Sequence, residues 1–120
     1  MLNRRVVITG LGAITPCGVG VDKFWKSMLE GKSGTSHIEN IPLEGHTVTL
    51  AAEIKNKDFN AEEVLGPKEA KRMDRFTQFA IVAADEAIAD AGIDEANIDP
   101  YKIGVMVSAA AGGFSTFEKN

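Results

Sequence analysis

The sequence predicts an α/β fold in which a long helix connects two parallel strands. Two apolar runs, Val6–Ile8 and Ile103–Ala111, have the composition of strands that are buried on both faces of a sheet. Between them, residues 67–91 follow a helical pattern of apolar positions. Because parallel strands need a crossover connection, and a helix is available to make one, we expect the second strand to lie beside the first.

A glycine-rich turn follows the first strand and leads into a helix. Glycine stands at positions 10, 12, 18 and 20. This spacing indicates positive φ angles or a close approach of neighbouring chain. Asp22 is a good N-cap for a helix that ends at Gly31. Its apolar residues share one face, which we expect to pack on the sheet; they are Phe24, Trp25, Met28 and Leu29.

The middle of the chain is predicted to contain an edge strand between an irregular segment and helices. Residues 32–45 are expected to be irregular, whereas residues 47–54 alternate apolar and polar side chains as an edge strand does. Asn60–Glu63 has the pattern of a capping box for a short helix. Gly66–Pro67 ends that helix and starts the next, which is predicted to continue without interruption through residue 91.

The last helix signal stands close to the end of the sequence. Gly92 is expected to end the long helix, and Asp99–Pro100 breaks the chain before the second apolar run. Ser115–Glu118 then has a capping-box pattern, shortly before Asn120. Because an isolated helix shorter than ~12 residues is marginal, we expect the sequence to be a fragment of a longer protein.

Composition argues against several kinds of partner. With 13 basic and 17 acidic residues among 120, the net charge of −4 offers no overall field for nucleic acid or an anionic membrane. No apolar run approaches the ~18 residues of a membrane span, and no signal peptide precedes the first strand. The single Cys17 excludes an internal disulfide and fits a reducing cytoplasm. With only His37 and His46 beside it, no zinc-ligand spacing is present, so no metal is expected.

Two features of the N-terminal turn suggest chemistry that the surrounding residues do not support. Cys17 is a possible nucleophile, but nothing in the turn would activate it, and a small apolar turn residue is the simpler interpretation. Thr9–Gly12 follows a strand as a dinucleotide-binding loop would. However, Thr15 stands where the third glycine belongs, and no acidic residue closes a βαβ unit at the expected distance. We therefore expect no nucleotide cofactor. His37 and His46 have no evident partners in the sequence, and we expect both to be surface residues.

Four motifs in order resemble the N-terminal part of β-ketoacyl-acyl-carrier-protein synthases, most closely the type II condensing enzymes of bacterial fatty-acid synthesis. They are Arg4–Gly18, Trp25 with Gly31–Gly34, Lys71–Phe79 and Ala111–Gly113. The resemblance implies a thiolase-like fold of two duplicated halves in α/β/α/β/α layers, usually assembled as a homodimer. Residues 1–120 would then form a partial N-terminal domain, truncated before the nucleophile.

The resemblance also implies a reaction, a decarboxylating Claisen condensation of an acyl thioester with malonyl-acyl-carrier protein, without a cofactor. In that family a cysteine at a strand-to-helix turn is the nucleophile, and two histidines from the second half stabilise the oxyanion. All three would lie beyond Asn120, so no catalytic residue is assigned within residues 1–120 and the fragment is expected to be inactive. Two alternatives remain open: a non-catalytic chain-length-factor-like or polyketide ketosynthase partner of the same fold, and a nucleotide-binding module.

A cluster of basic residues is the first candidate site. If residues 67–91 form one helix, four basic side chains share a face; they are Lys68, Lys71, Arg72 and Arg75. One interpretation is an ordinary solvated face with Glu69 and Asp74 as intrahelical partners. The other is a dock for the acidic helix and phosphopantetheine phosphate of an acyl carrier protein. The resemblance assigns docking to Lys68, Lys71 and Arg72 and gives Arg75 no counterpart.

The turn Ala111–Gly113 is the second candidate site. It follows the second apolar run, at the end where α/β sheets place their ligand sites. One interpretation is that the glycines only let the chain turn. In the resembling enzymes, however, the residue before this Gly-Gly pair is often a larger aliphatic that gates the acyl pocket. With Ala111 at that position, we expect Ala111, Gly112 and Gly113 to form a pocket wall that admits longer or branched acyl chains.

Overall fold

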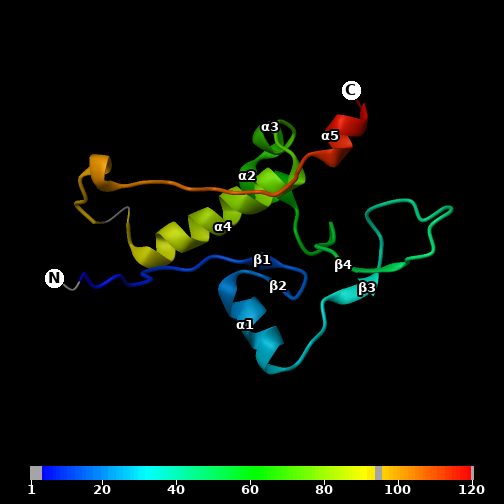
Figure 1. The fold of residues 1–120 in the computed structure, drawn as a ribbon, viewed down its shortest axis with the longest axis horizontal. Helices are drawn as coiled ribbons and strands as arrows, with labels where there is room; N and C mark the ends of the chain where they lie inside the picture. The colour runs from blue at the N-terminus through cyan, green and yellow to red at the C-terminus, as the bar shows by residue number, and fades with distance from the viewer. Residues whose placement is uncertain (1–3, 94–95, 120) are drawn as a thin grey trace.

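Helix α4 is the longest element, and the other elements are arranged around it (Figure 1). The computed structural model describes residues 4–93 and 96–119. The helices are α1 (Val21–Leu29), α2 (Ala61–Leu65), α3 (Pro67–Ala70), α4 (Arg75–Ala91), the 3₁₀ helix η1 (Pro100–Lys102) and α5 (Phe114–Lys119). The strands are β1 (Ile14–Thr15), β2 (Gly18–Val19), β3 (Thr35–His37) and β4 (Leu50–Ala52). Within the described residues, no helix is both long and apolar enough to span a membrane.

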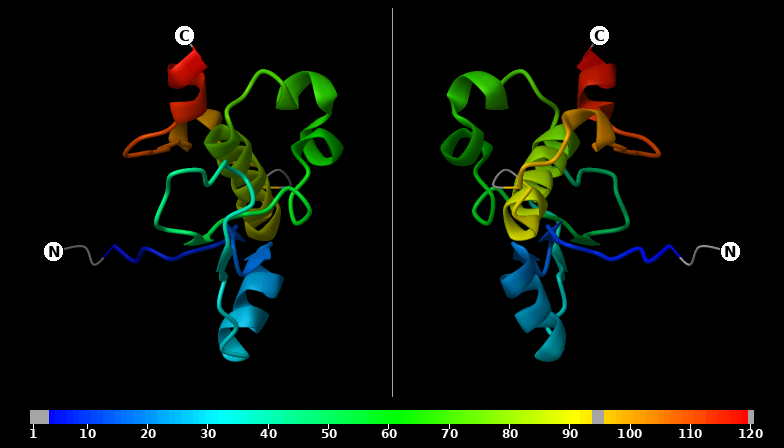
Figure 2. Two further views of the ribbon diagram at one scale, coloured as in Figure 1. Left: turned by 90° about the vertical axis from the view of Figure 1, so that its right-hand side faces the viewer. Right: turned by 90° about the vertical axis from the view of Figure 1, so that its left-hand side faces the viewer.

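The glycine-rich segment lies directly against α4. A Cβ at Gly12 would overlap the carbonyl oxygen of Ala83, and one at Gly10 would overlap that of Ala87. Only glycine lets the two backbones approach so closely, which confirms the expected close approach. The segment then forms the antiparallel hairpin β1–β2, in which Ile14 pairs with Val19. Figure 2 shows α4 between α1 and α5.

Two carboxylates of α4 hold the same segment by hydrogen bonds. The carboxylate of Glu86 accepts from the backbone N–H groups of Ala13 at 2.9 Å and Val21 at 2.8 Å. One turn further along, Asp90 accepts from the N–H of Leu11 at 3.0 Å. Because an ionised acceptor strengthens a hydrogen bond, these two side chains fix the chain that leads into α1.

A second antiparallel pair, β3 with β4, confirms the predicted edge strand in part. Thr35 pairs with Ala52 and His37 with Leu50. The strand is shorter than the predicted 47–54, and its partner β3 lies in the segment that was expected to be irregular. The alternating pattern predicts that the apolar side chains lie on the covered face, but Leu50 is 52% exposed. Only the face that carries Ser36 and Ala51 is partly buried, and the face that carries Leu50 and Ala52 is exposed.

A small core forms where α2, α3 and the first turns of α4 meet; we call residues 59–79 the helical corner. Phe59, Ala61 and Ala70 are buried there, as is the polar Gln78. The rings of Phe59 and Phe79 meet edge to face, with centroids 5.3 Å apart. The Cα radius of gyration of the whole molecule is 17.6 Å, against about 14 Å for a compact domain of this length. The molecule is therefore less compact than a domain of this length, and its buried residues among those described lie in the corner.

The two predicted parallel strands are not strands in the structure. Residues 4–13 and 103–109 are extended, but neither segment forms a ladder with any described residue. Their apolar side chains are open to solvent: Val6 is 93% exposed and Met106 is 95% exposed. The prediction was wrong because a central strand needs a hydrogen-bonding neighbour on each side, and the described residues supply none. Instead, both segments run along α4, and Ile14, which follows the first segment, lines one hollow with Val107 and Ala109 of the second.

The predicted uninterrupted helix over residues 67–91 is divided into two. Helix α3 ends at Ala70, residues 71–74 form a turn, and α4 begins after the N-cap Asp74. Asp74 has the extended backbone of an N-cap (φ −64°, ψ 154°), so the continuous pattern could not be one helix. The division lets α3 fold back onto the core through Ala70.

Several helix boundaries agree with the sequence, whereas the start and the exposure of α1 do not. Helix α1 begins at Val21 after Gly20, so Asp22 lies in its first turn and is not the predicted N-cap. The Asn60 side chain accepts from the N–H of Glu62 at 3.1 Å, and Gly92 ends α4 in the left-handed conformation, as expected. Helix α5 begins at Phe114, one residue before the predicted cap. Helix α1 packs on the β1–β2 hairpin. Its predicted buried face is largely open, with Trp25 60% exposed, because the two-residue strands of that hairpin cover only a small part of the helix.

Candidate functional site

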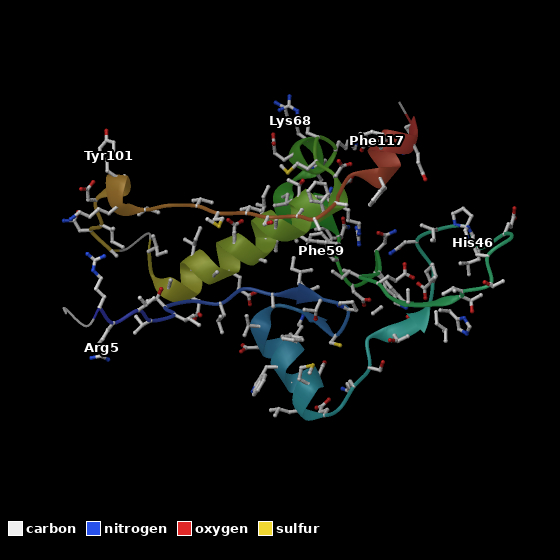
Figure 3. The ribbon with its side chains drawn as sticks, viewed as in Figure 1. Arg5, His46, Phe59, Lys68, Tyr101 and Phe117 are labelled. Carbon is white, nitrogen blue, oxygen red and sulfur yellow. The ribbon has the colours of Figure 1, made fainter. Side chains whose placement is uncertain are left out.

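The basic residues of the first candidate site lie on α3 and in the turn that follows it. Lys68 is on α3, Lys71 is the C-cap of that helix, and Arg72 is in the turn. All three are exposed, and Figure 3 shows Lys68 pointing away from the body of the molecule. We call Lys68, Lys71 and Arg72 the basic trio. Its members lie close together on a short helix and the turn that follows it, so they form one exposed cluster of positive charge.

The local sequence explains why the chain turns sharply at this point. Gly66 has a φ of 84°, which non-glycine residues rarely adopt, and it ends α2 directly before Pro67. Pro67 occupies the first position of α3, where its missing N–H costs nothing. The N–H of Ala70 donates to the carbonyl of Gly66 at 3.0 Å, and the small Ala70 side chain is buried in the corner. The basic residues on either side of Ala70 are thereby left outside.

Arg75 does not join the trio, although the spacing predicted a shared face. Its guanidinium donates to the carbonyl of Ile54 at 3.0 Å and lies over the rings of Phe59 and Phe79, at 5.7 and 5.0 Å from their centroids. Burial lowers the pKa of Arg75, with nearby Glu53 opposing that effect. The break at residues 71–74 turns Arg75 inward, so its side chain contacts the core and is not part of the solvated face that the sequence also allowed.

Nearby acidic side chains neutralise only a small part of the positive charge of the trio. Arg72 and Glu69 form an ion pair at 3.6 Å, and both side chains are at least half exposed. Such a pair contributes little in water, so an incoming anion can replace it at low cost. Asp74, the other partner proposed from the sequence, turns to the hydroxyl of Thr116 and not to a basic residue. The surface can therefore attract an acidic partner despite the negative charge of the whole chain.

Gln78 is part of this site, and reasoning from the sequence did not assign it a role. It is buried on α4 and donates two hydrogen bonds to the turn that carries Lys71 and Arg72. The signal was present in the sequence, because a glutamine interrupts an otherwise apolar stretch of the helix. A buried polar group must be hydrogen-bonded, and its partners could be identified only once the break in the helix was known.

The second candidate site, Ala111–Gly113, lies beside the first turn of α4. Gly112 and Gly113 line a hollow of about 460 Å³ together with Phe76 and Phe117. The φ of 72° at Gly113 favours glycine, and a Cβ at Gly112 would come within 2.8 Å of the Phe76 ring, so a side chain there would displace that ring. Ala111 is exposed at the start of the turn. A mostly apolar recess behind a glycine turn is a surface on which an acyl chain could lie.

The remaining singled-out residues lie apart from both candidate sites. Cys17 is in the β1–β2 turn, where its thiol is near the carbonyl of Lys32 at 3.7 Å and packs close to Gly34. His37 is exposed on β3, and His46 is exposed in the loop before β4 (Figure 3). Among the described residues, no cluster of three or more histidine, cysteine or acidic side chains could hold a metal ion.

Comparison with known proteins assigns nearly all of the chain to the family that its sequence motifs resemble. Residues 3–120 match the family model described as beta-ketoacyl synthase, N-terminal domain. The chain is 48% identical over 116 residues to 3-oxoacyl-[acyl-carrier-protein] synthase 2 of Staphylococcus aureus (strain N315), covering 97% of this chain and 28% of the relative. It is 42% identical over 118 residues to the protein of the same name from Synechocystis sp. (strain ATCC 27184 / PCC 6803 / Kazusa), covering 97% of this chain and 27% of that relative. The chain thus spans little more than a quarter of these relatives.

Proposed function

The chain belongs to the β-ketoacyl synthase family, whose domain is α/β and thiolase-like, and from that premise we propose that it is part of a 3-oxoacyl-acyl-carrier-protein synthase. The whole protein would be an acyltransferase that condenses an acyl thioester with malonyl-acyl-carrier protein in fatty-acid elongation. The observation that carries the proposal is similarity along 97% of the chain to relatives named for this activity. Nucleophile and oxyanion-stabilising groups would come from outside residues 1–120, and the whole protein would be a cytoplasmic homodimer.

Within that enzyme, the basic trio would be a docking surface for the acyl carrier protein. The support is the exposure of Lys68, Lys71 and Arg72 on one short helix and turn, with only one weak ion pair between them and acidic neighbours among the described residues. Clustered cations opposite an acidic partner accelerate encounter and fix orientation even in an acidic chain. Since Arg75 points inward, the docking surface consists of the trio alone.

Reversing two charges of the trio tests the docking role. We expect the double substitution Lys68→Glu and Arg72→Glu in the whole enzyme to weaken carrier-protein binding at low salt by at least about tenfold, because attraction becomes repulsion. The matched control is Lys26→Glu with Lys102→Glu, which changes the net charge equally at exposed positions elsewhere. Equal affinities of the two double variants, measured by titration calorimetry, would exclude docking at the trio.

The glycine turn would form part of the acyl-pocket wall. Gly112 and Gly113 line the hollow next to Phe76, and the small Ala111 precedes them. We expect Ala111→Ile in the whole enzyme to reduce elongation of long and branched acyl chains more than that of short chains, because the larger side chain narrows the entrance. Unchanged selectivity across acyl lengths would remove Ala111 from the pocket.

A further inference from the structure

The two basic residues of the turn, Lys71 and Arg72, are bracketed by two carbonyl groups that one buried side chain holds. Nε2 of Gln78 donates to the carbonyl oxygen of Ala70 at 2.8 Å and to that of Met73 at 3.2 Å. Ala70 directly precedes the basic pair and Met73 directly follows it. The amide therefore fixes both ends of the dipeptide whose side chains project into solvent.

The chemistry of this contact requires a nitrogen group with two N–H donors, which the glutamine amide supplies without a charge. Both partners are acceptors, so only a group with two N–H donors satisfies them together. Within the part of the chain that the structure describes, no other side chain hydrogen-bonds to the backbone of residues 70–73. Gln78 is itself only 9% exposed and stands on the rigid α4 helix. The position of the turn is thus set from the inner side, by a side chain that is itself almost fully buried.

We propose that Gln78 is a positioning residue for carrier-protein docking. The inference rests on the proposed function and deepens it: the Gln78 amide holds Lys71 and Arg72 in fixed register with Lys68, so that the three cations meet anionic groups of the carrier protein already arranged. A turn released from this contact would carry the same charges in many orientations. Ordering it again on binding would cost affinity.

The test compares two kinds of substrate for one variant of the whole enzyme. Gln78→Met keeps the length of the side chain and removes both donors. We expect the KM for carrier-protein-bound substrate to rise by about five- to tenfold, the change expected from one lost hydrogen-bonding group. The kcat and KM for the same acyl group on carrier-free coenzyme A should stay close to wild type, since that substrate does not need the trio. Asn97→Met is the control, because it removes an exposed amide that hydrogen-bonds to none of the described residues.

The outcomes separate this inference from the function on which it rests. Neutralising the trio must raise the KM for carrier-protein substrate; if it does not, the docking function itself is wrong. If it does, but Gln78→Met leaves that KM unchanged or raises the KM of both substrates equally, the positioning role is overturned and the docking function stands. In the trio-neutralised background, Gln78→Met should add little. Gln78→Glu is a second variant, which sets a carboxylate oxygen against the two carbonyls and should raise the same KM.

Discussion

The helical corner and the two extended apolar segments contrast in how their hydrophobic residues are used. In the corner, Phe59 is 2% exposed, and the amide nitrogen of the buried Gln78 donates two hydrogen bonds. In the extended segments, Val6 and Met106 are almost fully exposed although their sequence is the more hydrophobic. Hydrophobicity alone therefore does not bury a segment. The corner is buried because short turns hold α2, α3 and α4 together, and because Ile14 and Val19 of the β1–β2 hairpin pack against its core as well.

The largest expected effect follows from removing the centre of the corner. Phe59→Ala should lower the free energy of unfolding by about 3–5 kcal/mol, because it opens a cavity under Phe79 and Arg75. Met106→Ala, in an extended segment and 95% exposed, should change it by less than about 0.5 kcal/mol. Urea denaturation of the 120-residue chain measures both. A similar loss from the two substitutions would mean that the second extended segment is packed.

A smaller effect is expected where the first extended segment meets α4. Gly12→Ala should cost about 1–3 kcal/mol, because the new Cβ overlaps the carbonyl oxygen of Ala83 and the backbones must separate. Gly104→Ala is the matched control in the other segment, where a Cβ would have none of the described residues within 4 Å. There we expect no loss, or a gain of about 0.4–1 kcal/mol from the stiffer unfolded chain. Thermal melts of both variants compare the two segments directly, and equal melting temperatures would contradict the close contact.

The smallest of the three effects concerns the hydrogen bonds that tie the N-terminal segment to α4. Glu86→Gln should cost about 1–2 kcal/mol, since the amide keeps one acceptor and replaces the other, charged acceptor with a donor facing an N–H. Asp85→Asn, at the neighbouring position on the solvent side of the helix, is expected to be nearly neutral. Denaturation midpoints of the pair decide the point, because a Glu86 effect no greater than that of Asp85 would show that the carboxylate does not hold the segment.

The sequence predicted most accurately those features whose causes are local. The Asn60 cap, the Gly66–Pro67 boundary and the left-handed Gly92 are set by one or two residues and their own backbones, and all three are present. The two central strands failed because a strand is stabilised by neighbours far away in sequence, which periodicity cannot identify. The break after Ala70 was missed because the charged pattern continues at helical spacing across it.

The same reasoning explains what could be predicted of the candidate docking site. Lys68, Lys71 and Arg72 were identified from their spacing and from the family resemblance, and the structure brings them together on one exposed turn. Whether Arg75 would join them depended on the course of the backbone between α3 and α4, and the structure turns it inward. Gln78 could not be assigned, because its role depends on two carbonyl groups that are free only where the helix is interrupted.

Hydrogen exchange of the 120-residue chain tests the contrast between the two regions most directly. Amides in the middle of α4 should be protected, because their bonds lie within a packed helix, whereas those of Val6–Ile8 and Val105–Val107 should exchange at nearly the rates of an unfolded peptide. Protection of the two apolar segments equal to that of α4 would show that they are paired in a sheet, and would contradict the division of this chain into a packed corner and two unpaired segments.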